Sequence, residues 1–234
     1  MRLSVLAIYI ALCSLLANGC SKGITRATAA TVLWLKGKVI FGNAERNDFR
    51  LVTLKSRIHD GDSVRLPGDA SIDLMLIPAA LARVPGDSEI KIDELSITKD
   101  GNQTAGGMRD RSARIRLIRG KIIIVFSPSE TSASHFAINA GQLTINPDSD
   151  CLFSVWTDGK TTRVTCTRGH INASGEARPP VTIAAGYFQK WPTARIQTTA
   201  AASDATAQID ITESLQAEEQ LLDQAAGWQN RRPF

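Results

Sequence analysis

The stretch CLFSVWTDGKTTRVTCTRGHINAS, Cys151–Ser174, decides the fold of this chain. Apolar residues alternate with polar ones on both sides of Asp158-Gly159. An Asp-Gly pair between two such runs is the strongest short-range signal for a β-hairpin. Phe153, Val155, Val164 and both cysteines fall on one face, so the stretch predicts a core hairpin that carries no catalytic group.

The register of this hairpin determines how its two cysteines are interpreted. With a two-residue loop at Asp158-Gly159, Cys151 lies opposite Cys166, at a Cα separation of about 5.5 Å that a disulfide can span. A four-residue loop, Thr157–Lys160, keeps the same partners and makes them the closer, non-hydrogen-bonded kind of pair. In an oxidising compartment we expect a disulfide, and the alternative is two buried thiols.

The N-terminus has the pattern of an export signal. Arg2 precedes an apolar run of about fifteen residues, Leu3–Ala17, which suits a signal-peptide core and falls short of the ~20 residues of a spanning helix. The run closes on Gly19-Cys20, which resembles a bacterial lipobox. We expect residues 1–19 to be a signal peptide and Cys20 to carry a lipid anchor in the bacterial periplasm or outer membrane. Ordinary cleavage, for example after Ala29, and an uncleaved anchor are the alternatives.

The middle of the chain has the pattern of a β domain. Residues 20–30 form a polar tether, and from residue 31 to residue 192 short apolar alternations are separated by Gly, Pro and Asp turns about every ten residues. This spacing predicts an all-β domain, either an antiparallel sandwich or roll or a solenoid-like stack of short strands. A hydrophobic content of 43% is sufficient for a sizeable core.

The C-terminal segment, residues 193–234, differs in composition and charge. Residues 199–208 are rich in Ala, Ser and Thr, which is typical of a linker, and a helix is expected over Glu213–Ala226. Its apolar stripe would comprise Ile211, Leu215, Leu222 and Ala225. We expect this linker and amphipathic helical tail to dock on the body or to remain disordered. Its net charge of −3 contrasts with +4 for the whole chain, and no nucleic-acid-binding motif accompanies that small positive charge.

Several glycine-marked segments resemble the FecR domain over roughly residues 31–192. They are Gly61–Arg65, Ile115–Ile122, the hairpin with its sequel Gly169-His170-Ile171, and Val181–Gly186. The resemblance implies an extracytoplasmic β domain. Classical members also carry a cytoplasmic anti-sigma segment before a membrane span, whereas only Met1 and Arg2 precede the apolar run here. We therefore expect a short, lipoprotein-like form without that segment.

The densest basic cluster lies between residues 109 and 121. Its members are Arg109, Arg111, Arg114, Arg116, Arg119 and Lys121. On a strand, Arg114 and Arg116 share one face while Ile115 and Leu117 enter the core. One interpretation is a patch for anionic envelope material, such as phosphorylated lipid or acidic glycan. The simpler interpretation is the solvated face of an antiparallel sheet, where arginines keep strand edges soluble.

The sequence contains no recognisable catalytic or cofactor motif. It lacks Gly-x-Ser-x-Gly, His-Glu-x-x-His and a glycine-rich phosphate loop. Asp60-Gly61-Asp62 and Asp148-Ser149-Asp150 suit turns better than a calcium loop. We predict a protein that is not an enzyme and has no cofactor and no metal site.

The expected function is that of an exported binding or scaffold module. Its partners would be the membrane, through the lipid anchor, and an envelope glycan, anionic lipid or envelope protein, but not a nucleic acid. The alternative is a periplasmic signalling component that relays a surface signal to a separate membrane or sigma-regulator partner. An enzyme is a third hypothesis, for which a cleft with convergent titratable groups would be needed.

Overall fold

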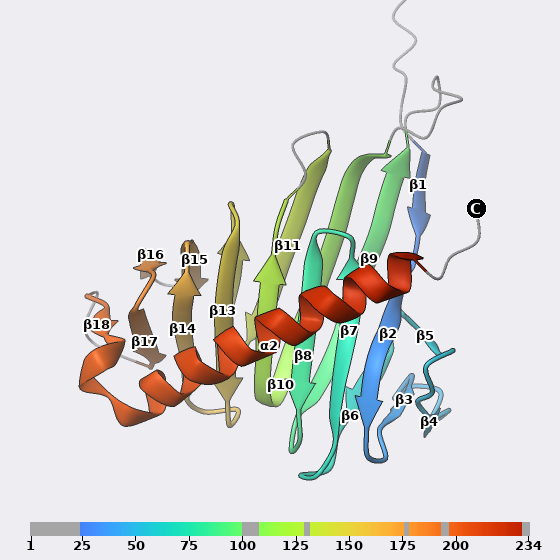
Figure 1. The fold of residues 1–234 in the computed structure, drawn as a ribbon, viewed down its shortest axis with the longest axis horizontal. Helices are drawn as coiled ribbons and strands as arrows, with labels where there is room; N and C mark the ends of the chain where they lie inside the picture. The colour runs from blue at the N-terminus through green and yellow to red at the C-terminus, as the bar shows by residue number, and fades with distance from the viewer. Residues whose placement is uncertain (1–23, 100–107, 129–131, 176–177, 193–196, 231–234) are drawn as a thin grey trace, which may run out of the picture.

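The computed structural model describes residues 24–99, 108–128, 132–175, 178–192 and 197–230, which form two β-sheets and one long helix (Figure 1). The first strands are β1 (Ile24–Ala27), β2 (Ala29–Lys36), β3 (Ile40–Gly42), β4 (Arg50–Leu51), β5 (Arg57–His59), β6 (Ser63–Arg65), β7 (Ser71–Ile77), β8 (Ala80–Pro85) and β9 (Glu89–Lys99). The later strands are β10 (Met108–Phe126), β11 (Ala133–Ala140), β12 (Leu143–Pro147), β13 (Cys151–Thr157), β14 (Thr162–Arg168), β15 (His170–Gly175), β16 (Arg178–Ala184), β17 (Tyr187–Trp191) and β18 (Thr199–Ala200). A short 3-10 turn, Ala201–Ser203, leads into the helix α2 (Ala205–Asn230). This confirms the predicted all-β fold with a C-terminal helical tail.

The strands form two hydrogen-bonded sheets. Sheet A contains, in order, β16, β15, β12, β11, β10 and β9. The other edge of β9 pairs with β6 at its start and with β1 at its end. Strand β3 pairs with β6, and β4 pairs with β3. Sheet B contains, in order, β5, β2, β7, β8, β10, β13, β14, β17 and β18. Strand β10 belongs to both sheets and joins them.

Glycines form the corners at which the chain passes from one sheet to the other. Strand β10 makes this passage at Gly120, whose φ is +88° and at which a Cβ atom would lie 2.3 Å from Ser88 Oγ. Only glycine tolerates both conditions. Positive-φ glycines at residues 37, 61, 169 and 186 stand at four other such passages. The turn glycines of the FecR-like segments therefore lie where the chain leaves one sheet and enters the other.

One pair of neighbouring strands departs from the antiparallel arrangement. Strands β10 and β11 run parallel, with Asp110 opposite Ala133. Because β10 folds over at Gly120, its last residue, Phe126, has already returned toward the start of β11 in the other layer. The short connection 127–132 is therefore long enough for a parallel pair, which otherwise needs a long crossover.

The main core lies between the two sheets, where their alternating apolar residues meet. The largest fully buried side chains include Phe41, Phe126 and Phe153, and the rings of Phe126 and Phe136 stack at a centroid distance of 5.9 Å. Burying one such side chain stabilises the fold by about 1.5–3 kcal/mol. This layered core fixes which strand residues point outward, and so it positions both outer faces.

The central hairpin forms as predicted, but its register is shifted by two residues. Its loop is Asp158–Thr161, so that Thr157 pairs with Thr162 and Phe153 pairs with Cys166. The Asp158 carboxylate accepts the backbone N–H groups of Lys160 and Thr161 at 2.8 and 2.6 Å. These hydrogen bonds, which also lower the pKa of Asp158, stabilise a four-residue loop one position later than expected.

The predicted disulfide is wrong, because this register separates the two cysteines. Cys166 lies opposite Phe153, whereas Cys151 pairs with Phe126 of β10, beyond a bulge between Leu152 and Phe153. Both cysteines are free and fully buried in the main core. Of the two alternatives that the sequence left, the structure has two buried thiols.

Helix α2 begins earlier and is longer than predicted. Residues expected to form a linker are instead strand β18, the 3-10 turn and the first helical turn. The Asp204 carboxylate accepts the backbone N–H groups of Thr206 and Ala207, both at 3.0 Å, and so caps the helix. Lys190 binds the same carboxylate at 2.8 Å. The pKa of Asp204 is lowered by Lys190 first and by the Ala207 N–H next.

The face on which α2 packs also differs from the predicted stripe. Its buried residues are Ala207, Asp210, Ser214, Ala217, Leu221 and Ala225. Each lies three or four residues from the next, as on one face of a helix. Leu215 and Leu222 of the predicted stripe are about half exposed, at 52% and 48%. Small residues lie on the contact face because they let the helix approach the sheet closely.

Candidate functional site

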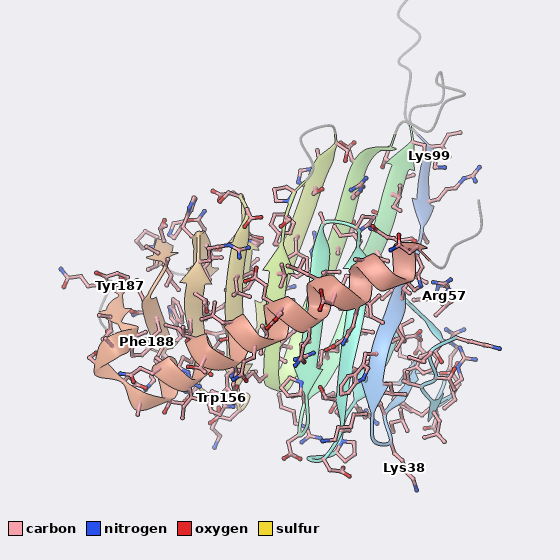
Figure 2. All side chains as sticks on the ribbon, in the orientation of Figure 1. Lys38, Arg57, Lys99, Trp156, Tyr187 and Phe188 are labelled. Carbon is pink, nitrogen blue, oxygen red and sulfur yellow. The ribbon has the colours of Figure 1, made fainter. Side chains whose placement is uncertain are left out.

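The two outer faces of the molecule are different. Helix α2 crosses the outer face of sheet B and packs on β2, β8, β10, β13 and β14 (Figure 1). Tyr187 and Phe188, labelled in Figure 2, lie near the start of the helix, and Phe188 packs with Ala201 and Ala207. Among the described residues, no element is paired with or packed on the outer face of sheet A in this way. That face is the candidate functional surface.

Polar side chains line the open face of sheet A in rows that cross the strands. Thr144 Oγ1 donates to Asn139 Oδ1 at 3.1 Å between β12 and β11. Thr182 Oγ1 donates to Asn172 Oδ1 at 2.7 Å between β16 and β15. Ser174 stands opposite Thr144 in the first of these rows. We call this surface, from β11 to β16, the amide–hydroxyl face; its side chains can both donate and accept hydrogen bonds.

The basic cluster is divided between the two outer faces. Arg114, Arg116 and Arg119 are each about half exposed, and each forms an ion pair with an acidic residue of β9: Glu94 at 3.6 Å, Asp93 at 3.1 Å and Glu89 at 3.6 Å, respectively. Exposed pairs of this kind contribute about 0–1 kcal/mol each, but they offset the positive charge of the surface. The patch for anionic material stays a prediction.

The other members of the basic cluster lie elsewhere. Lys121 is on the outer face of sheet B, where it binds Asp210 of α2 at 2.6 Å and also contacts Glu213. Arg111 is partly buried, and its Nε atom has no hydrogen-bond partner. The Arg109 side chain lies outside the described part of the structure, as does Cys20. The structure therefore does not bring the six residues together at one site.

A cavity of about 590 Å³ opens beside the arginine end of the amide–hydroxyl face. Its polar lining comes from three neighbouring strands and the ends of their loops: Ser112, Arg114, Ser132, Ser134, His135, Asn146 and Asp148. Asp148 accepts a hydrogen bond from Asn172 Nδ2 at 3.3 Å, and its Oδ1 lies 3.0 Å from His170 Nε2. The cavity thus adjoins the polar rows and shares their hydrogen bonds.

A second cavity, of about 480 Å³, lies near the C-terminal end of α2. Met75, Ile97 and Trp228 contribute to an apolar lining. Arg57, labelled in Figure 2, stands at this cavity and donates from Nη1 to Thr31 Oγ1 at 2.6 Å. This second cavity has fewer polar groups in its lining than the first cavity.

A buried ion-pair network fastens α2 to sheet B. The Asp210 carboxylate binds Lys121 Nζ at 2.6 Å and Arg163 Nε at 2.7 Å, and it accepts a hydrogen bond from Thr165 Oγ1 at 3.2 Å. Nearby, Arg168 contacts Glu218. The sequence interpretation missed Asp210 because it began the helix at Glu213, three residues beyond it. Asp210 lies three residues after Ala207 and four residues before Ser214, on the same face of the helix. This spacing of small and polar residues is the signal that could have identified it.

The described residues form neither a membrane-spanning helix nor a metal-binding cluster. Within that part of the chain, no helix has both the length and the apolar character needed to cross a membrane. Nor do three or more His, Cys, Asp or Glu side chains gather there as a metal site would need.

Comparison with known proteins found little similarity. No protein-family model matches the chain, and no curated protein matches it. Two crystal structures of a candidate anti-sigma factor from Parabacteroides distasonis, at 1.65 and 2.50 Å resolution, are similar to it with TM-scores of 0.41 and 0.40. Sequence identity is 7% in both cases, and the match covers 58% of this chain. The chain spans 57% of the length of each of those chains.

Proposed function

We propose that this protein is a non-enzymatic, exported binding or scaffold module of the bacterial cell envelope. The observation that carries the proposal is the difference between its outer faces: α2 covers sheet B, whereas no element of the described residues packs on the amide–hydroxyl face of sheet A. Rows of Asn, Thr and Ser side chains on a rigid sheet can form many directed hydrogen bonds without moving. The glycine-cornered segments that resemble the FecR domain support an extracytoplasmic role.

The chemistry of the open face favours recognition over catalysis. Three of its carboxylates already have neighbours: Asp93 pairs with Arg116, Glu94 pairs with Arg114, and Asp148 lies next to His170. A general acid or base needs a pKa matched to proton transfer and free access to the reacting atom. Carboxylates held in ion pairs on an exposed surface are instead suited to orienting neighbouring side chains.

Export and lipid anchoring rest on the apolar run Leu3–Ala17 and on Gly19-Cys20. Intact-mass analysis and membrane partition of the native protein, compared with a Cys20→Ser variant, test both. A chain that begins at Cys20 with acyl groups attached is the expected result. An unmodified chain, or one that retains Met1, would contradict the anchor.

Binding through sheet A is tested by retention of the mature protein on isolated envelope. Thr144→Lys combined with Thr182→Lys places two long cations on the amide–hydroxyl face and should release the protein. Gln216→Lys combined with Gln220→Lys adds the same charge to the exposed side of α2 and is the matched control. Equal retention of both double variants would exclude sheet A as the binding face.

The way in which α2 docks favours a second candidate function, the relay of a signal to a separate membrane partner. The contact face of the helix consists largely of Ala, Ser and Asp, with ion pairs at Asp210 and Glu218. Leu221 is the one large apolar side chain among the buried residues of α2, so neutralising the ion pairs would remove much of what holds the helix on the sheet. A helix that remains docked under all conditions, as judged by protease resistance, would argue against a relay.

A further inference from the structure

The cavity beside the amide–hydroxyl face is lined by polar side chains that a ligand can reach. Ser112 and Asn146 are half-buried, and Arg114, His135 and Asp148 are exposed. The Oγ atoms of Ser132 and Ser134, two further lining residues, are instead buried, with no hydrogen-bond partner among the described residues. The groups available to a ligand are therefore a hydroxyl, an amide, an imidazole, a guanidinium and a carboxylate.

The polar lining of the cavity is mixed rather than strongly charged. Arg114 is offset by Glu94, and Asp148 is held by His170 and Asn172. The remaining groups are hydroxyls, one amide and the His135 imidazole; a hydroxyl and an amide can each donate and accept hydrogen bonds. A highly charged ligand would find no matching excess of opposite charge. A ligand with many hydroxyl groups would find complementary partners.

The apolar lining and the size of the cavity agree with the same class of ligand. Pro128, Ala133, Ala137 and Pro147 provide small apolar surfaces between the polar groups. Such surfaces suit the C–H faces of a sugar ring, whose hydroxyls lie around its edge. The volume of about 590 Å³ lies within the usual range for small-ligand sites, about 300–1,000 Å³.

We infer that this cavity is a saccharide-binding site, and that the amide–hydroxyl face extends it for a longer chain. The inference rests on the proposed function and names the ligand class of its open face. Asn146 lies between the cavity and the rows: it lines the cavity and stands opposite Asn172. Sugar rings bound in the cavity would be followed by rings that hydrogen-bond along Asn172 and Thr182.

The test is binding of the mature protein to an array of uncharged oligosaccharides of glucose, galactose and N-acetylglucosamine, alongside inorganic phosphate. Asn146→Ala should weaken saccharide binding by about tenfold. Ala137→Trp should fill the cavity and abolish binding. Gln216→Ala removes an amide from the exposed side of α2, away from sheet A, and should bind within about twofold of wild type.

The possible results separate this inference from the proposed function. Absence of binding to every saccharide, or equal binding by all three variants, would overturn the saccharide site. Binding of phosphate alone would overturn the ligand class. If envelope retention still depends on Thr144 and Thr182 in either case, the proposed function stands while the inference fails. A soluble saccharide that displaces the protein from the envelope identifies an envelope glycan as the source of the ligand, whereas saccharide binding without displacement identifies a free saccharide.

Discussion

Asp210 Oδ1 lies 2.6 Å from Lys121 Nζ, and this contact ties the C-terminal helix to the strand that joins the two sheets. The Asp210 side chain is 3% exposed, and its two cationic partners, Lys121 and Arg163, are 12% and 10% exposed. One carboxylate therefore compensates two nearly buried positive charges. Glu213 also contacts Lys121, but it is half exposed.

Replacing Asp210 by Ala should destabilise the protein by about 3–5 kcal/mol, because it leaves buried cations without their partner. Denaturant midpoints, measured by fluorescence, check this value. Asp223→Ala, on the exposed side of the same helix, is the control and should change stability by less than about 0.5 kcal/mol. Equal effects of the two substitutions would show that α2 is not docked through Asp210.

The two leucines of α2 provide a direct test of which helix face is buried. Leu221 is fully buried against the outer face of sheet B, whereas Leu215 is 52% exposed. Leu221→Ala should cost about 2–5 kcal/mol of stability through lost burial and a residual cavity. Leu215→Ala, the same chemical change, should cost under about 1 kcal/mol. A larger loss of stability for Leu215→Ala than for Leu221→Ala would show that the helix packs through the stripe predicted from the sequence.

Gly120 is the corner at which β10 changes sheets, and it should not tolerate a side chain. Gly120→Ala combines a left-handed φ of +88° with a Cβ atom 2.3 Å from Ser88 Oγ, and we expect a loss of at least about 3 kcal/mol. Gly186 has a similar φ of +80° with no atom within 4 Å of the added Cβ. Gly186→Ala should therefore cost only about 1–2 kcal/mol. Thermal unfolding of both variants measures the difference, and equal losses would contradict a crowded corner at Gly120.

The two core thiols should be unreactive in the folded protein. Burial raises the pKa of Cys166 from 9.0 to about 11 and raises that of Cys151 further. Since the unfolded thiols lose their protons first, stability should be unaffected below about pH 9 and should fall as the pH rises from 9 toward 11 and above. The variant Cys151→Ala with Cys166→Ala should show a weaker decline in its denaturant midpoint over that range.

Mass-spectrometric mapping of an alkylating reagent checks the state of the same cysteines. Without reductant, Cys151 and Cys166 should be unlabelled in the native protein and fully labelled after unfolding. Failure to label either one after unfolding would indicate the disulfide that the shifted register argues against.

The sequence predicted the strands well because the alternation of apolar residues reflects local burial. Gly61, Gly120, Gly169 and Gly186 were recognised as turns, but their role as corners between two sheets depends on strands far apart in the sequence. The hairpin register was wrong because one side chain, Asp158, fixes the loop. A pattern of apolar residues does not reveal a capping interaction of this kind.

The helix face and the candidate site could be predicted only in part, for different reasons. The predicted stripe included Leu215 and Leu222 because their side chains are large and apolar. In the structure, close packing and ion pairs instead place Asp210 and Ser214 in the interface. Tertiary contacts overrode simple hydrophobicity there. On sheet A, Arg114 was noticed for its charge, but its pairing with Glu94 and its place beside a cavity required the registers of β9, β10 and β11.

Carboxylate labelling in the presence of isolated envelope tests the central claim, that the open face of sheet A is the binding face. Asp148 lies beside the amide–hydroxyl face with 56% of its side chain exposed, and Asp223 is exposed on α2. A water-soluble carbodiimide with a small amine labels both in the free protein. Envelope should reduce labelling of Asp148 severalfold and leave Asp223 unchanged. Protection of Asp223 alone, or of neither residue, would contradict the account.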